Sequence, residues 1–99
     1  MIRHMVMWNF REGLTEEQTS EYALRIKTEL EGLIDKIYGI KSIFVEISPL
    51  PTSNRALLLN SLFDSEETLA SYQIHPEHLK VSDFIRSVTQ DTGCVDYCE

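Results

Sequence analysis

The chain has 99 residues, of which 42% are hydrophobic and 25% are charged, with only four glycines and three prolines. This composition is typical of a single globular domain over residues 1–99 with one modest core, and it excludes a disordered or repetitive chain. The net charge of −7, from 16 acidic and nine basic residues, argues against binding to nucleic acid or to an anionic membrane, because both require clustered Lys and Arg.

The first predicted elements are a strand over residues 2–10, rich in β-branched, aromatic and apolar side chains, and a long helix. The sequence Thr15-Glu-Glu-Gln18 is a capping box that starts the helix. Apolar residues then recur at helical spacing until Gly39 ends the helix. The recurring positions are Tyr22, Ala23, Ile26, Leu30, Leu33, Ile34 and Ile37.

The second half of the chain predicts strands over residues 40–47 and 56–63, separated by a proline-containing loop over residues 48–55. Residues 64–67 start a short helix, Pro76 begins another that runs to about Ser87, and residues 88–97 form a weaker fourth strand. The order β-α-β-β-α-β predicts an α+β, ferredoxin-like sandwich, in which helices cover one face of a four-stranded antiparallel sheet.

Two of the predicted strands are apolar on both faces, although helices can cover only one of them. The first strand places His4, Val6 and Trp8 on one face and Met5 and Met7 on the other, and the third strand carries leucines on both. The cover that we expect for the second face is another copy of the chain. The sequence therefore predicts a homodimer in which sheet packs on sheet.

The opening of the chain is too short and too interrupted for a signal peptide, and no stretch approaches the roughly 20 apolar residues of a membrane helix. Cys94 and Cys98 lie four residues apart in a predicted strand, so their Cα atoms would be about 13 Å apart, beyond the reach of a disulfide. We therefore expect a reduced, cytoplasmic protein that does not bind a membrane.

The segment Tyr72-Gln-Ile-His75-Pro-Glu-His78 gathers the most chemically active groups. Proline disfavours helical geometry in the residue before it and suits the first position of a helix, so one helix should end near Ile74 and His75 should cap the next. His78 then lies in the first turn, where unpaired N–H groups favour a neutral imidazole that can accept a proton.

Each of these residues also has a structural explanation. His75 is most simply a helix cap, His4 a hydrogen-bonded core histidine, and Tyr72 an anchor of the helix corner through its hydroxyl. For His78, function and structure explain the position equally well. His4, His75 and His78 are residue types that bind metal, but no nearby carboxylate completes the set, and the sequence has no glycine-rich phosphate loop. We therefore expect no metal and no cofactor.

Several features together carry a resemblance to a known family: the opening Ile2-Arg-His-Met-Val6, the capped first helix, Phe63-Asp64, the His-Pro-x-His element and the closing Val95-Asp-Tyr97. From about residue 2 to residue 97 the chain resembles the stress-responsive α/β barrel (Dabb) domain family, one of the dimeric α+β barrels. The resemblance implies a ferredoxin-like fold whose two sheets close into a β-barrel in the dimer. Members include plant proteins made under stress, many bacterial proteins of unknown role, and a plant polyketide cyclase branch.

The resemblance to the cyclase branch implies a pocket between the helices and the sheet, with its functional groups at His4, Tyr72 and His78. In such a site His78 would remove a proton next to a carbonyl, Tyr72 would hydrogen-bond the enolate, and His4 would orient either group. This chain departs from the branch at Leu57, where the cyclases carry a further histidine. The candidate wall residues of the pocket are Trp8, Tyr22, Ile26, Leu59, Thr92 and Cys94.

Two classes of function remain open at this stage. The favoured class is a small dimer without enzymatic activity, whose pocket holds a small hydrophobic or carbonyl-containing molecule. The alternative is a cofactor-free lyase or cyclase, or a monooxygenase-like enzyme on the same kind of barrel. An accessible cavity where His4, Tyr72 and His78 converge favours the enzyme. A space filled by Trp8, Phe10 and Tyr22 favours the first class.

Overall fold

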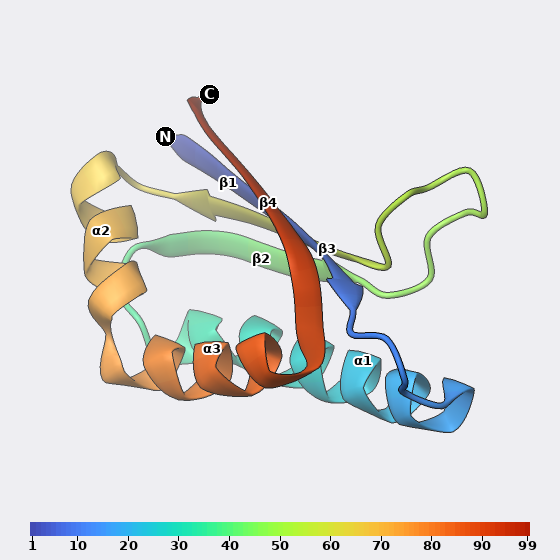
Figure 1. Cartoon of the computed structure of the whole chain (residues 1–99). Helices are drawn as coiled ribbons and strands as arrows, with labels where there is room; N and C mark the ends of the chain where they lie inside the picture. The colour runs from blue at the N-terminus through green and yellow to red at the C-terminus, as the bar shows by residue number, and fades with distance from the viewer.

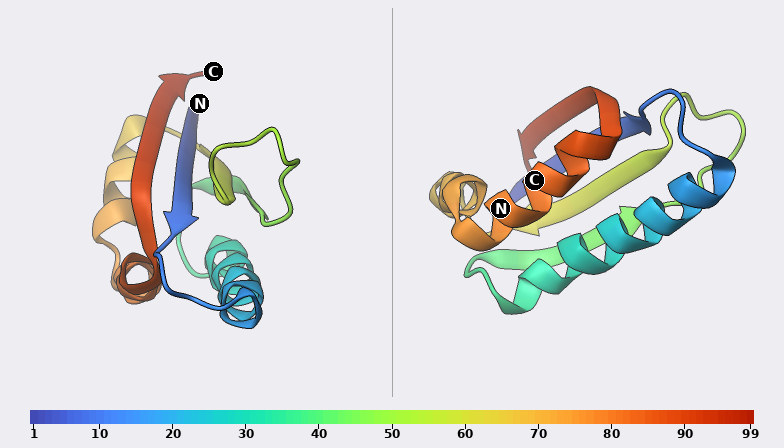
Figure 2. Two further views of the ribbon diagram at one scale, coloured as in Figure 1. Left: turned by 45° about the vertical axis from the view of Figure 1, so that its right-hand side comes forward. Right: turned by 60° about the horizontal axis from the view of Figure 1, so that its bottom comes forward.

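A computed structural model describes all residues, 1–99, as a four-stranded sheet with helices on one face (Figures 1 and 2). The strand order is β2-β3-β1-β4 and all neighbours are antiparallel, which confirms the ferredoxin-like prediction. None of the helices combines the length and hydropathy that a membrane-spanning segment requires. The elements are β1 (Ile2–Phe10), α1 (Glu16–Glu31), the 3-10 helix η1 (Gly32–Asp35), β2 (Ile40–Glu46), β3 (Leu57–Phe63), α2 (Glu66–Ile74), α3 (Pro76–Val88) and β4 (Thr89–Cys98).

The start of α1 follows the predicted capping box. The side chain of Thr15 accepts a hydrogen bond from the Gln18 N–H at 3.1 Å, and the Gln18 side chain accepts one from the Thr15 N–H at 2.9 Å. These two bonds satisfy N–H groups that the first turn of a helix otherwise leaves without partners. The helix therefore begins where local sequence alone places it.

The predicted long helix is divided in the structure. The α-helix ends at Glu31, and η1 then turns the chain toward β2. Gly32 lowers helix propensity at the boundary, and a 3-10 helix has only three residues per turn. This tighter turn brings Leu33 into the core and leaves Ile34 40% exposed. The predicted place of Ile34 on the buried face is therefore wrong.

Gly39 allows the chain to pass closely beneath the start of α2. Its φ angle of 98° lies in the left-handed region that favours glycine. A Cβ atom at this position would lie 2.5 Å from the Cβ of Thr68, in the first turn of α2. The Gly39 carbonyl accepts a hydrogen bond from the Asp64 N–H at 3.0 Å. This contact sets the position of α2 relative to the sheet.

The corner between α2 and α3 is formed as predicted. The first helix ends at Ile74, and His75 is the N-cap of the second, which begins with Pro76. The Glu77 N–H donates a hydrogen bond to Nδ1 of His75 at 3.1 Å. His75 therefore has the structural role that its place before proline predicted.

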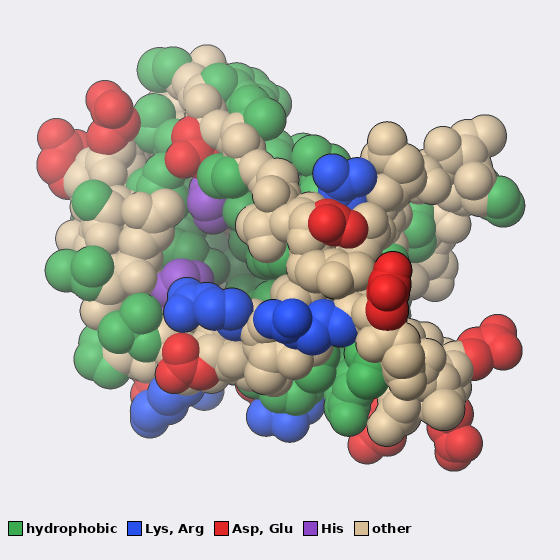
Figure 3. Space-filling view, viewed as in Figure 1, with side chains coloured by type: hydrophobic (Ala, Val, Ile, Leu, Met, Phe, Trp, Pro, Cys, Tyr) green, Lys and Arg blue, Asp and Glu red, His purple; other side chains and the backbone are tan.

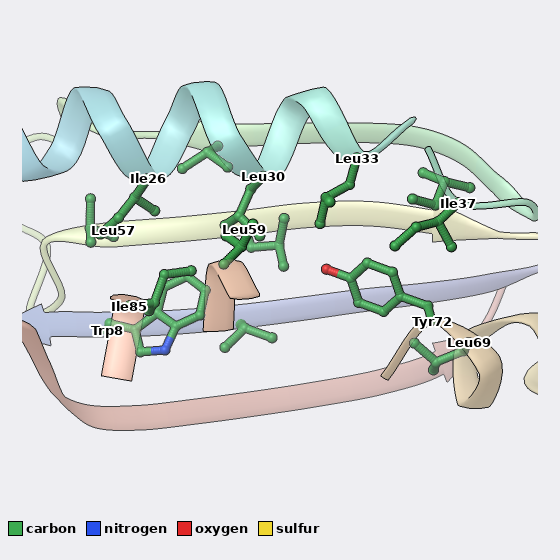
Figure 4. Close-up of a cluster of buried hydrophobic side chains, with 14 of the residues drawn as sticks. Trp8, Ile26, Leu30, Leu33, Ile37, Leu57, Leu59, Leu69, Tyr72 and Ile85 are labelled. Carbon is green, nitrogen blue, oxygen red and sulfur yellow. The ribbon is translucent and has the colours of Figure 1, made fainter. Parts of the chain in front are cut away.

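The core lies between the sheet and the helices (Figure 4). Side chains at alternate positions of β1 and β3 point toward the helices, while those between them point to the opposite, outer face, as β-strand geometry requires. Large apolar side chains remain exposed on the outer face, including Phe44, Val95 and Tyr97 at 51%, 54% and 48%. The prediction that both faces are apolar is thus confirmed. The half-buried side chains on this outer face include Met5, Met7, Leu58 and Leu62.

An ion pair on α1 covers the edge of the sheet at β2. Lys27 donates a hydrogen bond to the Val45 carbonyl at 2.8 Å, and Glu31 accepts one from the Val45 N–H at 2.9 Å. Lys27 and Glu31 are themselves 2.7 Å apart. Because these bonds satisfy outward-facing backbone groups, another strand is hindered from adding at this point.

Candidate functional site

A cavity of about 290 Å³ lies between the sheet and the two C-terminal helices. In the space-filling view it is a hollow with a hydrophobic floor and histidine on its walls (Figure 3). Its size is at the lower end of the range for small-molecule sites, so it suits a small ligand. The apolar part of its lining includes Val6, Trp8, Leu30, Leu59 and Ile85.

The structure brings the three candidate catalytic residues together in this cavity. His4 reaches it from β1, Tyr72 from α2 and His78 from α3. Among the candidate wall residues, Trp8, Leu59, Thr92 and Cys94 line the same cavity. Trp8 forms part of the wall without closing the space, and Phe10 packs against the core outside the lining.

Two candidate wall residues, Tyr22 and Ile26, lie elsewhere. Tyr22 packs edge-on against Phe84, with ring centroids 5.7 Å apart, because its position on α1 faces α3 rather than the cavity. Ile26 is fully buried on the side of the core where Leu57 lies (Figure 4). Leu57 is also outside the lining, so β3 contributes only Leu59 to the site.

The hydroxyl of Tyr72 is the most unusual group of the site. Tyr72 is completely buried, and its hydroxyl oxygen has no hydrogen-bond partner in the protein. The hydroxyl points toward Leu30 and Leu59, two apolar residues of the cavity (Figure 4). Burial raises the pKa of the phenol well above its ordinary value, so the group keeps its proton and is a hydrogen-bond donor. The sequence analysis offered this hydroxyl as an anchor of the helix corner, but the structure gives it no hydrogen-bond partner.

His78 is prepared as a neutral base. Burial lowers the pKa of its imidazole below the ordinary value, the hydrogen bond to Gln73 partly opposes the shift, and the electrostatic effects of His4, Arg86 and His75 lower the pKa further. Nδ1 lies 3.3 Å from the Gln73 carbonyl oxygen. Because a carbonyl can only accept, Nδ1 carries the proton and Nε2 keeps a free lone pair.

His4 is oriented by a carboxylate that the sequence analysis did not assign to the site. Its Nδ1 lies 2.5 Å from Oδ1 of Asp96 and donates to it, while the ring itself is almost fully buried. The two residues are direct partners in the pairing of β1 with β4. Because Nδ1 is bound to Asp96, Nε2 is the ring nitrogen of His4 that remains available to the cavity. Only the strand register, not the local sequence, reveals this pair.

Cys94 completes a small group of metal-binding residue types with His4 and Asp96. The ligand atoms of the three side chains lie within 4.8 Å of one another, and His75 is outside the group. These donors suit zinc. However, the His4–Asp96 hydrogen bond occupies the space between two of them, and burial together with Asp96 raises the pKa of the Cys94 thiol. The set of His4, His75 and His78, which the sequence analysis considered and disfavoured, does not form a cluster of ligand atoms.

The sequence analysis also missed Ser82 and Arg86, which line the cavity from α3. They follow His78 at intervals of four residues, so all three lie in one row along the helix. This spacing was the available signal, but it is informative only once the face of α3 that meets the cavity is known.

Comparison with known protein families gives a match over nearly the whole chain. Residues 2–99 match the stress responsive A/B barrel domain, Dabb. The chain belongs to the Dabb family. This Dabb domain is 25% identical over 99 residues to olivetolic acid cyclase from Cannabis sativa, across 97% of this chain and 94% of the cyclase.

Solved structures show the same fold as this Dabb domain. A dimeric protein of unknown function with a ferredoxin-like fold from Bacteroides fragilis is 27% identical, with a TM-score of 0.90 across 97% of this chain and 93% of that chain. A hydroxynitrile lyase from Passiflora edulis is 15% identical, with a TM-score of 0.78 across 97% and 90% of the two chains. The fold is thus shared by enzymes and by proteins of unknown function.

Proposed function

We propose that the cavity binds a small carbonyl compound and that His78 removes a proton from the carbon next to the carbonyl group. The observation that carries this proposal is the Tyr72 hydroxyl, which is buried and has no partner, on a residue that borders the same cavity as the neutral imidazole of His78. Leaving a buried polar group without a partner costs about 1–3 kcal/mol. A ligand oxygen that displaces the side chains covering this hydroxyl would supply the missing acceptor.

The chemistry follows from the placement of the proton donors and acceptors. Nε2 of His78 takes the proton from carbon, and the electrons of the broken C–H bond move into the carbonyl to form an enolate. The Tyr72 O–H donates a hydrogen bond to the oxygen on which the negative charge develops. His4, oriented by Asp96, lies edge-on to the Tyr72 ring, with ring centroids 6.2 Å apart, and lines the same space. Return of the proton from His78 to carbon completes the cycle.

The comparisons support this proposal over a purely structural role for the histidines. Olivetolic acid cyclase is an enzyme by name and aligns with 97% of this chain. Leu57 stands where the cyclase branch carries another histidine, so we extend only the proton-transfer step to this chain and not the cyclase product. The step requires only His78, Tyr72 and the His4–Asp96 pair, all of which are present.

The proposal is tested by hydrogen–deuterium exchange on two ketones of the same shape, 4-acetylbenzoate and 4-acetylbenzamide. Proton NMR in D2O follows the loss of the acetyl methyl signal. We expect the protein to accelerate exchange of at least one ketone over buffer, and His78→Asn to abolish the acceleration. His75→Asn is the matched control, because Asn also caps helices and His75 is outside the cavity. Full exchange by His78→Asn, or none by the wild type, contradicts the proposal.

We also propose that the chain forms a homodimer through the outer faces of two sheets. The exposed side chains of Phe44, Val95 and Tyr97 on this face support it, because large apolar side chains gathered on one face of a sheet are costly to leave in water. The 27% identical protein from Bacteroides fragilis is described as dimeric, which further supports this assembly. The cavity lies on the opposite side of the sheet, so pairing leaves it accessible.

A further inference from the structure

We propose that the ligand of the cavity is a carboxylic acid whose carboxylate binds Arg86. This inference rests on the proposed function of the same cavity and names its substrate class. Although the protein carries a net charge of −7, no Asp or Glu contributes to the cavity lining, which holds one arginine and two histidines. Asp96 binds His4 from outside the lining and His78 is neutral, so the fixed positive charge of the cavity is that of Arg86 on α3, and this side favours an anionic ligand.

The guanidinium of Arg86 has no acidic partner in the protein. None of the ion pairs of the structure includes it. Its one side-chain hydrogen bond is donated by Nη2 to the Ser82 hydroxyl at 3.3 Å. An arginine offers five N–H donors in a planar fork, so most of its donors remain free for a carboxylate.

A second guanidinium lies near the same end of α3. Nη2 of Arg11 donates to the backbone carbonyl of Arg86 at 3.0 Å, and Arg11 also takes no part in an ion pair. In the space-filling view, Lys and Arg side chains border the hollow next to the histidine (Figure 3). Two guanidinium groups thus lie at this end of α3, and that of Arg86 belongs to the lining of the cavity.

The spacing along α3 sets the length of the ligand. Members of the row His78, Ser82 and Arg86 are one helical turn apart, or about 6 Å between successive Cα atoms. The Arg86 side chain reaches back to Ser82, so its guanidinium lies about one turn from His78. A ligand that uses both groups carries its carboxylate about 6 Å from its carbonyl carbon, a separation that a single aromatic ring provides. The small cavity agrees with a ligand of this size.

The test compares binding of 4-acetylbenzoate with that of its neutral isostere, 4-acetylbenzamide, by calorimetry at neutral pH. We expect the acid to bind about tenfold more tightly than the amide, because a hydrogen-bonded charge pair contributes about 1.5 kcal/mol or more. Arg86→Gln should reduce this ratio to about one. Lys80→Gln is the matched control, since it removes the same charge from the same helix outside the cavity, and it should leave the ratio unchanged.

The outcomes separate this inference from the proposed function. Equal affinity of the wild type for acid and amide overturns the carboxylate site, and so does an unchanged ratio in Arg86→Gln. If the acid is preferred through Arg86 but neither ketone exchanges deuterium, the carboxylate site stands and proton abstraction fails. If both ketones exchange and bind equally, proton abstraction stands and the carboxylate site fails.

Discussion

The imidazole of His78 lies against the phenol ring of Tyr72, with ring centroids 4.2 Å apart and ring planes at 40°. The two residues belong to different helices, and the corner at His75 and Pro76 brings them together. The contact covers one face of each ring, while the Tyr72 hydroxyl remains without a partner. A base and a hydrogen-bond donor are therefore held side by side in one cavity.

Tyr72→Phe should stabilise the protein and impair the proposed reaction. Removing a buried hydroxyl without a partner should raise the free energy of unfolding by about 1 kcal/mol, measured by urea denaturation. The same change should slow ketone exchange by about 100-fold, because it removes the donor to the enolate oxygen. A loss of stability would instead show that the hydroxyl anchors the helix corner.

The pH dependence of exchange should report the protonation of His78. Only the neutral imidazole accepts a proton, and burial lowers its pKa below the ordinary 6.5. Exchange should therefore be lost as pH falls through a midpoint below 6.5 and stay level above it. NMR titration of the His78 ring protons should give the same midpoint. Arg86→Gln removes a nearby positive charge, so it should move the midpoint upward; a downward shift would contradict this electrostatic account.

Gly39→Ala should destabilise the protein much more than Gly13→Ala. Both glycines have positive φ angles, 98° and 88°. A Cβ at Gly39 would collide with Thr68, whereas a Cβ at Gly13 meets no atom within 4 Å. We expect a loss of about 1 kcal/mol for Gly13→Ala and about 2–4 kcal/mol for Gly39→Ala, measured by denaturant unfolding. Equal losses would mean that α2 moves to relieve the collision.

Val95→Glu should convert the proposed dimer into a folded monomer. Val95 is exposed on the outer face of β4, so a charge there would be buried without a partner only when two sheets pack together. Light scattering at micromolar concentration should give twice the chain mass for the wild type and one chain mass for Val95→Glu. Leu24→Glu, at an exposed position on α1, is the control and should remain dimeric. A monomeric wild type would refute the proposed assembly.

The elements of the fold were largely predictable because their signals are local. The capping box at Thr15 and the proline at position 76 determine helix ends through hydrogen bonds and steric exclusion between near neighbours. The apolar residues on both sides of β1 likewise predicted a sheet with two apolar faces, one of which the helices cover. The prediction was wrong at Ile34, where the switch to a 3-10 helix rotates the chain relative to the helical spacing.

Local patterns in the sequence alone determined the order of the elements and the cap at His75, and the resemblance to the Dabb family marked His4, Tyr72 and His78 as candidate residues. Tertiary structure decided what surrounds them. The partnership of Asp96 with His4 depends on strand register across 92 residues, and the place of Arg86 in the cavity depends on how α3 packs on the sheet. Likewise, whether the Tyr72 hydroxyl has a hydrogen-bond partner depends on every group packed around it. Such properties come from contacts between distant segments, which no local pattern records.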